Sequence, residues 1–392
     1  MKKTALVLAG GGARGAWQAG VLAWIGQALP AATGSPLRFD QMVGSSVGAL
    51  NAAFLAGAAE DLGAGTQALW DHWAGTEVGS VYRMRLRRLW RVPRALLQGG
   101  EAPRGPIALL DSGPLHRVVR ERVDWRGLKR ALWSGALGSL ALVATDLASG
   151  EATVFHQEGA GRGQPVPGRG RSFVPADLAP EHVFASVALP LLFPPVALGR
   201  HWYLDGGLSE QTPVGSALGL GARRILSLSL QAPATDATDH GWPPTWPRVI
   251  GKTMTAVLSD RSEPALERME RVNRLVRWGE GAYGPGFAER LAEGMGGGED
   301  GPWEPTEALA LHPSRDLGEL ASEQLAAGLQ GRVDDMTRVV FRFLQDTAGA
   351  GDADALSYLL FDPGYLHALL KLGWSDAEAQ GEAILAFLGD AE

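Results

Sequence analysis

Residues 4–16 read Thr-Ala-Leu-Val-Leu-Ala-Gly-Gly-Gly-Ala-Arg-Gly-Ala, an apolar run that ends in a cluster of glycines. Residues 4–9 have the length and composition of a buried strand, and residues 14–28 predict a helix. A glycine turn between a strand and a helix directs several backbone N–H groups into one space, beside the positive end of the helix. The stretch therefore predicts an α/β fold with an anion-binding loop after its first strand. The glycines of this loop are Gly10, Gly11, Gly12 and Gly15.

Strand-like and helix-like stretches continue to alternate through the first half of the chain. Further strands are expected at residues 38–43, 139–145, 151–156, 202–204 and 224–230, and an alanine-rich helix at 46–55. This alternation is typical of a parallel sheet with helices on both faces, whose strands share one C-terminal edge where ligands bind. We therefore expect a three-layer α/β/α sandwich with a mostly parallel sheet.

The pattern becomes helical after about residue 249. Helices are expected within residues 249–278, 317–346 and 353–388, and one further strand at 308–311. We expect a catalytic α/β domain at residues 1–235 and a mostly helical extension at 236–392, which packs on the domain and returns that strand to the sheet.

The composition excludes several classes of protein. The chain has 392 residues, of which 45% are apolar and 20% charged, as in folded globular proteins. Its net charge of −7 provides no basic field for nucleic acid, so no nucleic-acid partner is expected. The absence of cysteine excludes disulfides, thiolate metal sites and a cysteine nucleophile. The sequence does not determine the oligomeric state.

Neither a signal peptide nor a membrane-spanning segment is predicted. The apolar run after Met1-Lys2-Lys3 stops at Gly10, whereas a signal peptide needs an apolar region of roughly 7–15 residues. Nothing later in the chain reaches the roughly 18 apolar residues of a membrane span. We expect a cytoplasmic protein that is at most peripheral to a membrane.

The second motif is Gly44-Ser45-Ser46-Val47-Gly48, where the second strand meets the second helix. A Gly-x-Ser-x-Gly spacing suits a nucleophile elbow, in which a tight turn presents a serine hydroxyl and needs small neighbours on both sides. The spacing alone is weak support in a glycine-rich chain, but the strand–turn–helix context is the one that the motif requires. Ser46 is therefore the candidate nucleophile, flanked by Gly44 and Gly48.

The glycine loop fits two ligands, a dinucleotide pyrophosphate or the oxyanion of an acyl-transfer intermediate. A dinucleotide site expects an acidic residue at the end of the second strand, to bind the ribose. That position holds Gly44-Ser45, and the nearest acidic residue, Asp40, lies within the expected strand. A dinucleotide-binding oxidoreductase stays open as the alternative from the loop alone.

A serine nucleophile needs a base, and the chain offers an aspartate or a histidine. Asp205-Gly206-Gly207 follows the strand at 202–204, where an Asp-Gly turn is the simpler interpretation. A Ser–Asp–His hydrolase would instead use His240 or His312. Asp146 is expected to cap the turn at Ser149-Gly150, although its position at a strand end also fits a residue that lines the site.

The three motifs in this order resemble the patatin-like phospholipases. The similarity extends to Val43-Gly-Ser-Ser-Val-Gly-Ala-Leu-Asn-Ala52, Ala185-Ser-Val-Ala-Leu-Pro190 and Leu356-Ser-Tyr-Leu-Leu-Phe-Asp-Pro363, and so covers most of the chain. The resemblance implies a lipid acyl hydrolase that forms an acyl-Ser46 ester, with Asp205 as general base and no catalytic histidine. It also implies an oxyanion hole from the N–H groups of Gly11 and Gly12, and no metal or cofactor. Arg14 then steadies the loop or meets a lipid phosphate, unless it is an ordinary arginine of the helix surface.

The stretch from Arg83 to Arg94 carries six arginines among apolar residues. This composition fits an interfacial element that contacts anionic lipid head groups, with Trp90 at the polar–apolar boundary. It equally fits a solvated helix face. A peripheral membrane contact through this stretch is therefore a hypothesis, as is a third alternative, a non-catalytic docking protein built on the hydrolase fold.

Overall fold

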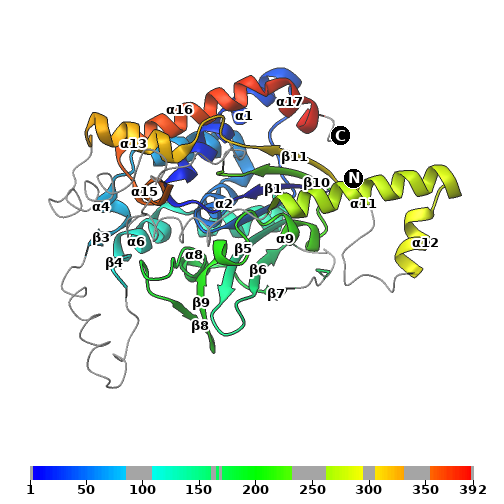
Figure 1. The fold of residues 1–392 in the computed structure, drawn as a ribbon, viewed down its shortest axis with the longest axis horizontal. Helices are drawn as coiled ribbons and strands as arrows, with labels where there is room; N and C mark the ends of the chain where they lie inside the picture. Colours follow the sequence, from blue (N-terminus) through cyan, green and yellow to red (C-terminus); the bar gives the residue numbers. More distant parts are fainter. Residues whose placement is uncertain are drawn as a thin grey trace, which may run out of the picture.

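The computed structural model describes residues 3–84, 108–159, 165–166, 170–231, 262–294, 305–330 and 354–389. Within these ranges nine strands form one sheet, in which the path β11-β10-β1-β2-β5-β6-β7 is extended by β9, paired to β5, and β8, paired to β9 (Figure 1). The strands are β1 (Thr4–Leu8), β2 (Gln41–Ser45), β5 (Ser139–Asp146), β6 (Ala152–Glu158), β7 (Arg171–Pro175), β8 (Val196–Leu198), β9 (His201–Asp205), β10 (Arg224–Leu228) and β11 (Glu307–Leu311). The short strands β3 (Arg83–Met84) and β4 (Leu110–Asp111) form a separate pair.

Helices join and cover these strands. They are α1 (Gly15–Thr33), α2 (Val47–Gly57), α3 (Leu62–Ala74), α4 (Val78–Val81), α6 (Gly113–Arg122), α7 (Trp125–Ser134), α8 (Pro180–Ser186), α9 (Val214–Gly219), α11 (Ser262–Tyr283), α12 (Phe287–Gly294), α13 (Leu317–Ala327), α15 (Asp354–Leu359), α16 (Pro363–Ala379) and α17 (Gly381–Gly389).

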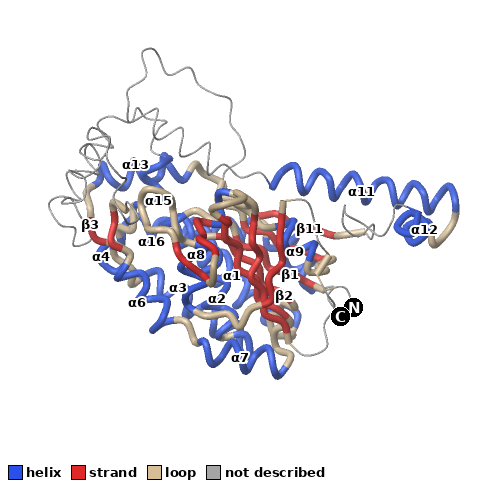
Figure 2. The backbone as a smooth tube through the Cα atoms, turned by 90° about the horizontal axis from the view of Figure 1, so that it is seen from below, coloured by secondary structure: helices blue, strands red, loops and turns tan. Residues whose placement is uncertain are grey.

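The predicted fold class is confirmed: the sheet is mostly parallel and lies between two helical layers. Alternate residues of each strand point to opposite faces. On one face Leu6 and Leu142 join a large core with α1, α2, α3 and α16, and on the other Val7 and Val143 pack on α9 (Figures 1 and 2). The strand expected at 38–43 begins later, at Gln41, because Asp40 lies just before it and binds the backbone N–H of Thr4 through its carboxylate.

Strand β9 runs antiparallel to β5, which decides where its last residue lies. Along one edge of β5, residues Ser139–Val143 pair with β2 and the next three residues pair with β9, with Ala144 opposite Asp205. The strands β2 and β9 therefore occupy successive parts of the same edge and run toward each other. Their C-terminal ends, Ser45 and Asp205, meet.

The C-terminal part of the chain adds to both the sheet and the helical layers. The strand expected at 308–311 is confirmed as β11, which pairs in parallel with β10. Helix α16 packs along α1, where side chains at Gly20 and Gly373 would collide with the backbone of the facing helix. The domain boundary expected near residue 235 lies outside the described residues.

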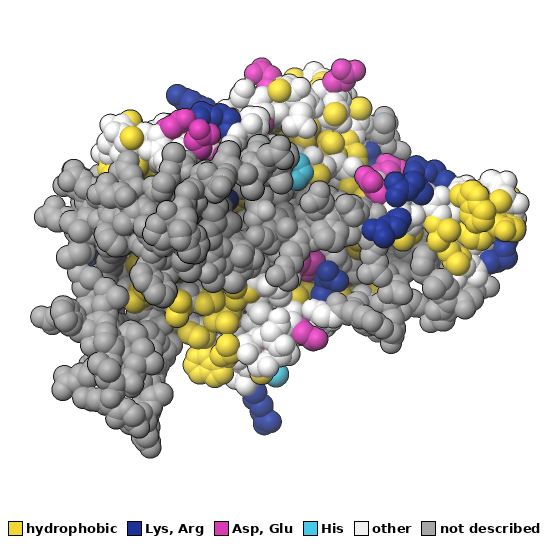
Figure 3. All heavy atoms as spheres, in the orientation of Figure 1, with side chains coloured by type: hydrophobic (Ala, Val, Ile, Leu, Met, Phe, Trp, Pro, Cys, Tyr) yellow, Lys and Arg dark blue, Asp and Glu magenta, His cyan; other side chains and the backbone are white. Residues whose placement is uncertain are grey.

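None of the helices in the described ranges has both the length and the hydrophobicity needed to span a bilayer. Of the arginine-rich stretch from Arg83 to Arg94, only Arg83 and Met84 are described, and the remainder lies outside the described residues. On the face drawn in Figure 3, apolar side chains gather over the outer end of β8 and β9, where Trp202 is half exposed.

Candidate active site

Ser46 occupies a sharp turn between β2 and α2. Its φ of 52° and ψ of −125° lie in a region that residues other than glycine seldom adopt, so the backbone is strained at this position. The strain is held by its neighbours, because the Ser46 N–H donates to Ser186 Oγ at 2.9 Å and Ser186 Oγ donates to the Val143 carbonyl at 2.6 Å. The turn places the Ser46 hydroxyl at the carboxyl edge of the sheet, at the N-terminus of α2.

Gly44 and Gly48, the two glycines that flank Ser46, leave no room for a side chain. A Cβ on Gly44 would collide with the carbonyl oxygen of Gly48. One on Gly48 would collide with the carbonyl oxygen of Leu8 in β1. The Gly-x-Ser-x-Gly spacing therefore reflects close backbone contacts across the elbow.

Asp205 is the hydrogen-bond partner of Ser46. The Ser46 hydroxyl donates to Asp205 Oδ2 at 2.7 Å, and the Gly207 N–H donates to Oδ1 at 2.8 Å. Asp205 has no exposed surface, and this burial raises its pKa from 3.8 to about 7, against the opposing effects of the two hydrogen bonds. The carboxyl group is therefore poised to accept a proton near neutral pH.

The glycine loop lies directly across from Ser46. A Cβ on Gly10 would come within 2.9 Å of the Ser46 Cβ. The Gly10 N–H donates to the Gln211 carbonyl at 2.9 Å, and Gln211 Nε2 returns a bond of 2.7 Å to the Gly10 carbonyl. In the described part of the chain, the N–H groups of Gly11 and Gly12 donate to no protein acceptor, so both are available to a ligand.

Arg14 does not lie on the helix surface, so the interpretation of Arg14 as an ordinary surface arginine is wrong. The side chain is buried, and its Nε donates to Ser357 Oγ at 2.7 Å while the guanidinium lies 4.2 Å from the ring centroid of Tyr358. Gly12 has a positive φ of 58°, and a Cβ there would collide with the Tyr358 carbonyl. The C-terminal part of the chain therefore packs directly against the glycine loop. Gly15, the first residue of α1, packs against Val47 of α2.

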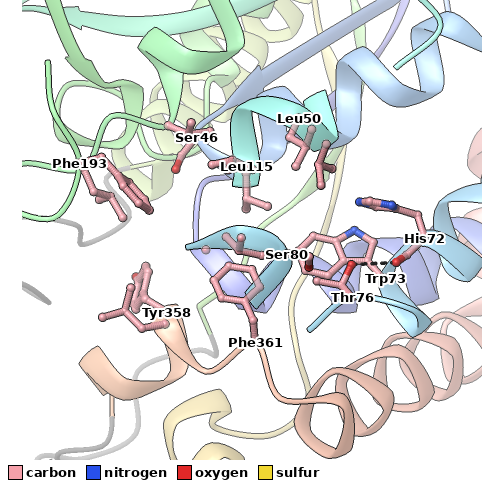
Figure 4. Close-up of a pocket in the computed structure, with 17 residues that line it drawn as sticks. Ser46, Leu50, His72, Trp73, Thr76, Ser80, Leu115, Phe193, Tyr358 and Phe361 are labelled. Atoms are coloured by element: carbon pink, nitrogen blue, oxygen red, sulfur yellow. Dashed lines mark hydrogen bonds between the residues drawn. The ribbon is translucent and has the colours of Figure 1, made fainter. Parts of the chain in front are cut away.

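A pocket of about 60 Å³ opens at Ser46 (Figure 4). Its lining residues are Gly12, Ser46, Val47, Leu50, His72, Trp73, Thr76, Ser80, Val81, Leu115, Val118, Val187, Leu189, Phe193, Tyr358, Leu359 and Phe361. None of them carries an aspartate, glutamate, lysine or arginine side chain, and most are aliphatic or aromatic. A lining of this kind suits a hydrocarbon chain.

No histidine of the described residues contacts Ser46 or Asp205. His72 lines the pocket, stacks on Phe54, and has a pKa lowered to about 4, first by burial and then by the charge of Arg122. His312 lies against the Gln231 carbonyl, and His240 is outside the described residues. The geometry thus provides an aspartate partner for Ser46 and no histidine partner within these ranges.

Asp146 caps a turn, as its simpler interpretation predicted. Its Oδ1 accepts the N–H groups of Ala148 and Ser149, and its Oδ2 lies 3.0 Å from His201 Nδ1. The Ser149 hydrogen bond is the main reason why the pKa of Asp146 is lowered. Asp146 does not line the pocket.

Several supporting side chains were not identified from the sequence. Beneath the elbow, Asn51 donates to the Gly15 carbonyl and to Gln18 Oε1, and accepts from Trp73 Nε1 at 3.0 Å. Ser186 and Gln211 brace the two turns from segments far away in the chain. A polar residue among alanines, such as Asn51, indicates a buried side chain that forms hydrogen bonds. No spacing rule identifies the partners of those bonds.

The described residues contain no group of three or more histidine, aspartate or glutamate side chains placed to bind a metal ion. The Ser46–Asp205 pair consists of a hydroxyl hydrogen-bonded to a buried carboxyl group, and groups of these types can perform acyl transfer.

Comparisons with known proteins identify the family of the chain. The family model of the patatin-like phospholipases matches residues 6–218. A search of curated proteins found no match. Among solved structures, the chain is similar to the crystal structure of VipD from Legionella pneumophila, with 11% identity and a TM-score of 0.34 over 97% of this chain and 67% of that chain. Because the family model covers more than half of the chain, the protein belongs to the patatin-like phospholipase family, a family of lipid acyl hydrolases.

Proposed function

We propose that the protein hydrolyses acyl esters of lipids by means of a Ser46–Asp205 dyad. The observation that carries the proposal is the 2.7 Å hydrogen bond from the Ser46 hydroxyl to Asp205 Oδ2, at the mouth of an apolar pocket. A serine hydroxyl is a weak nucleophile until a base accepts its proton. Asp205, with its pKa raised to about 7 by burial, is a stronger base than an ordinary aspartate.

In the first half-reaction, Ser46 Oγ attacks the ester carbonyl carbon while its proton passes to Asp205 Oδ2. The carbonyl oxygen becomes an oxyanion, which accepts hydrogen bonds from the N–H groups of Gly11 and Gly12. Collapse of the tetrahedral intermediate breaks the bond to the leaving alcohol, which takes the proton from Asp205. The acyl group then stays on Ser46 as an ester.

In the second half-reaction, water gives a proton to Asp205 and attacks the acyl-Ser46 carbonyl. A second tetrahedral intermediate forms in the same glycine loop and releases a free fatty acid when the proton returns to Ser46 Oγ. The positive N-terminus of α2 adds stabilisation to the negative charge that develops beside Ser46.

The pocket argues against the dinucleotide-binding alternative. A pyrophosphate needs cationic or polar partners around the glycine loop, whereas the described lining next to Gly12 is mainly apolar and lacks lysine and arginine. An acyl chain in this pocket is buried among aliphatic and aromatic side chains.

Labelling with a fluorophosphonate tests the proposal directly. We expect the reagent to modify Ser46 in the wild type and to leave the Ser46→Ala protein unlabelled, with hydrolysis of a lipid ester lost in parallel. Because acyl transfer through serine requires no Lewis acid, we also expect activity to persist in EDTA. Modification of a different serine, or loss of activity on chelation that calcium restores, would contradict the proposal.

A further inference from the structure

We infer that residues 356–361, here called the C-terminal wall, set the length of the acyl chain that the site accepts, and that Phe361 is the residue that limits it. The inference rests on the proposed role of Ser46, since the pocket at Ser46 is taken as the acyl pocket. The family model ends at residue 218, so this wall lies outside the segment that the family model matches.

The C-terminal wall forms one side of the pocket. Tyr358, Leu359 and Phe361 all line it, and Figure 4 shows Tyr358 and Phe361 projecting toward the side that carries Ser46 and Leu115. Two of the large aromatic side chains around the substrate space, Tyr358 and Phe361, thus come from a segment about 310 positions beyond the nucleophile.

Contacts at the start and in the middle of the C-terminal wall hold it in one position. At its start, Ser357 accepts the hydrogen bond from Arg14, whose guanidinium also lies over Tyr358. In its middle, the Tyr82 hydroxyl donates to the Leu359 carbonyl at 2.7 Å. A wall fixed by buried polar contacts cannot retreat freely to admit a longer chain, and so it can discriminate between lengths.

Phe361 lies where the far part of the pocket begins. Its ring stacks on Trp73 with a centroid distance of 6.3 Å and meets the edge of Tyr82 at 6.1 Å. In Figure 4 the Trp73–Phe361 pair lies on the side of the pocket away from Ser46. Thr76 and Ser80 also line the pocket, and their hydroxyls bond to backbone carbonyls and offer no gain to a methyl terminus.

The inference predicts shifts in chain-length preference in both directions. Replacing Phe361 by Ala or Leu removes the limit, so the chain length with the highest kcat/KM should increase. Each additional buried methylene should contribute about a fourfold gain in kcat/KM relative to the wild type. Leu359→Trp fills the same side of the pocket and should move the preference toward shorter chains.

The measurement is a series of p-nitrophenyl esters from hexanoyl to palmitoyl, with kcat/KM determined for each. Leu369→Ala is the matched control, because Leu369 is a buried side chain of the adjoining helix α16 and does not line the pocket. It lowers stability without touching the acyl chain, so its length profile should follow the wild type.

A second readout separates this inference from the proposed function. Binding of fatty acids of the same lengths to the Ser46→Ala protein, with or without Phe361→Leu, does not depend on hydrolysis. Absence of ester hydrolysis together with a length-dependent binding shift would overturn only the proposed function. Unchanged profiles in Phe361→Leu and Leu359→Trp, or an equal shift in Leu369→Ala, would overturn the inference.

Discussion

Ser46 Oγ and Asp205 Oδ2 lie 2.7 Å apart although 159 positions separate the two residues in the chain. They meet because β2 and β9 lie along one edge of β5 and run toward each other, so that the last residue of β9 reaches the turn that follows β2. The pair is largely buried, since Asp205 has no exposed surface and Ser46 is only 5% exposed. Both the contact and the burial follow from the antiparallel insertion of β9.

The first prediction concerns the two members of the dyad. Ser46→Ala and Asp205→Asn should each lower kcat/KM by a factor of about 10³ or more, and the double variant should be little worse because the two groups act together. Ester hydrolysis by the purified variants provides the measurement. The control is His312→Ala, which should retain most activity. A single histidine substitution as damaging as Ser46→Ala would instead identify a triad.

The second prediction concerns the pH dependence of the rate. Asp205 acts as a base only when ionised, and burial raises its pKa to about 7. We expect kcat/KM to rise about tenfold per pH unit below neutrality and to level off above it. A soluble short-chain ester avoids effects of pH on lipid aggregates. A rate that is already maximal in the acidic range would exclude Asp205 as the base.

The third prediction concerns the pH dependence of stability. A raised pKa means that the folded state holds the Asp205 proton more tightly than the unfolded state, so the free energy of unfolding falls as pH rises from 3.8 to above 7. Asp205→Asn removes this dependence. The free energy of unfolding of the variant, measured relative to that of the wild type, should therefore increase by on the order of 4 kcal/mol between about pH 4 and about pH 9. Denaturant unfolding at several pH values measures the free energy of unfolding of both proteins. A difference between them that does not change with pH would contradict the prediction.

The fourth prediction concerns Arg14. Arg14→Met keeps most of the buried volume but loses the bond to Ser357 and the charge over Tyr358. The glycine loop should then shift, and kcat should fall by up to about 10² with KM little changed, because a displacement of about 1 Å in catalytic groups has effects of this size. Arg120→Met is the matched control, since Arg120 also lies over an aromatic ring, that of Phe184, but on the surface. Equal effects of the two substitutions would contradict a specific role for Arg14.

The fifth prediction concerns contact with lipid surfaces. Each arginine near an anionic surface contributes about 1 kcal/mol of attraction, which salt screens over about 8–10 Å. Changing Arg85, Arg87, Arg88 and Arg91 together to Gln should weaken binding to phosphatidylserine vesicles and reduce its salt dependence. Hydrolysis of a soluble ester should stay the same. Vesicle binding equal to that of the wild type in low salt would identify the stretch as a solvated surface.

Trp202 permits an independent test of the same contact. It is half exposed at the second position of β9. Trp202→Ala should weaken vesicle binding by the same factor at low and at high salt, because indole rings partition to the membrane interface through apolar contact. Simultaneous loss of short-chain ester hydrolysis would point to damage within the site instead.

The local features of this protein were determined by its sequence. The apolar run at residues 4–9, the glycines after it and the turn at Ser46 predict a strand–turn–helix unit, because such turns depend on residues that are close in the chain. The strand of residues 308–311 was predicted by its composition and is β11. The family resemblance added Asp205 as the partner of Ser46, where local pattern alone favoured an ordinary turn.

Only the tertiary structure decided what surrounds these turns. The hydrogen bonds of Ser186, Gln211 and Ser357 to the elbow and the glycine loop join segments 140 to 343 positions apart. No local pattern predicts such contacts, because they depend on how the sheet orders its strands, on where α15 packs against the glycine loop and on where α16 packs against α1. Burial is likewise a property of the whole fold, and it raises the pKa of Asp205 to about 7, which the Asp-Gly pattern in the sequence does not predict.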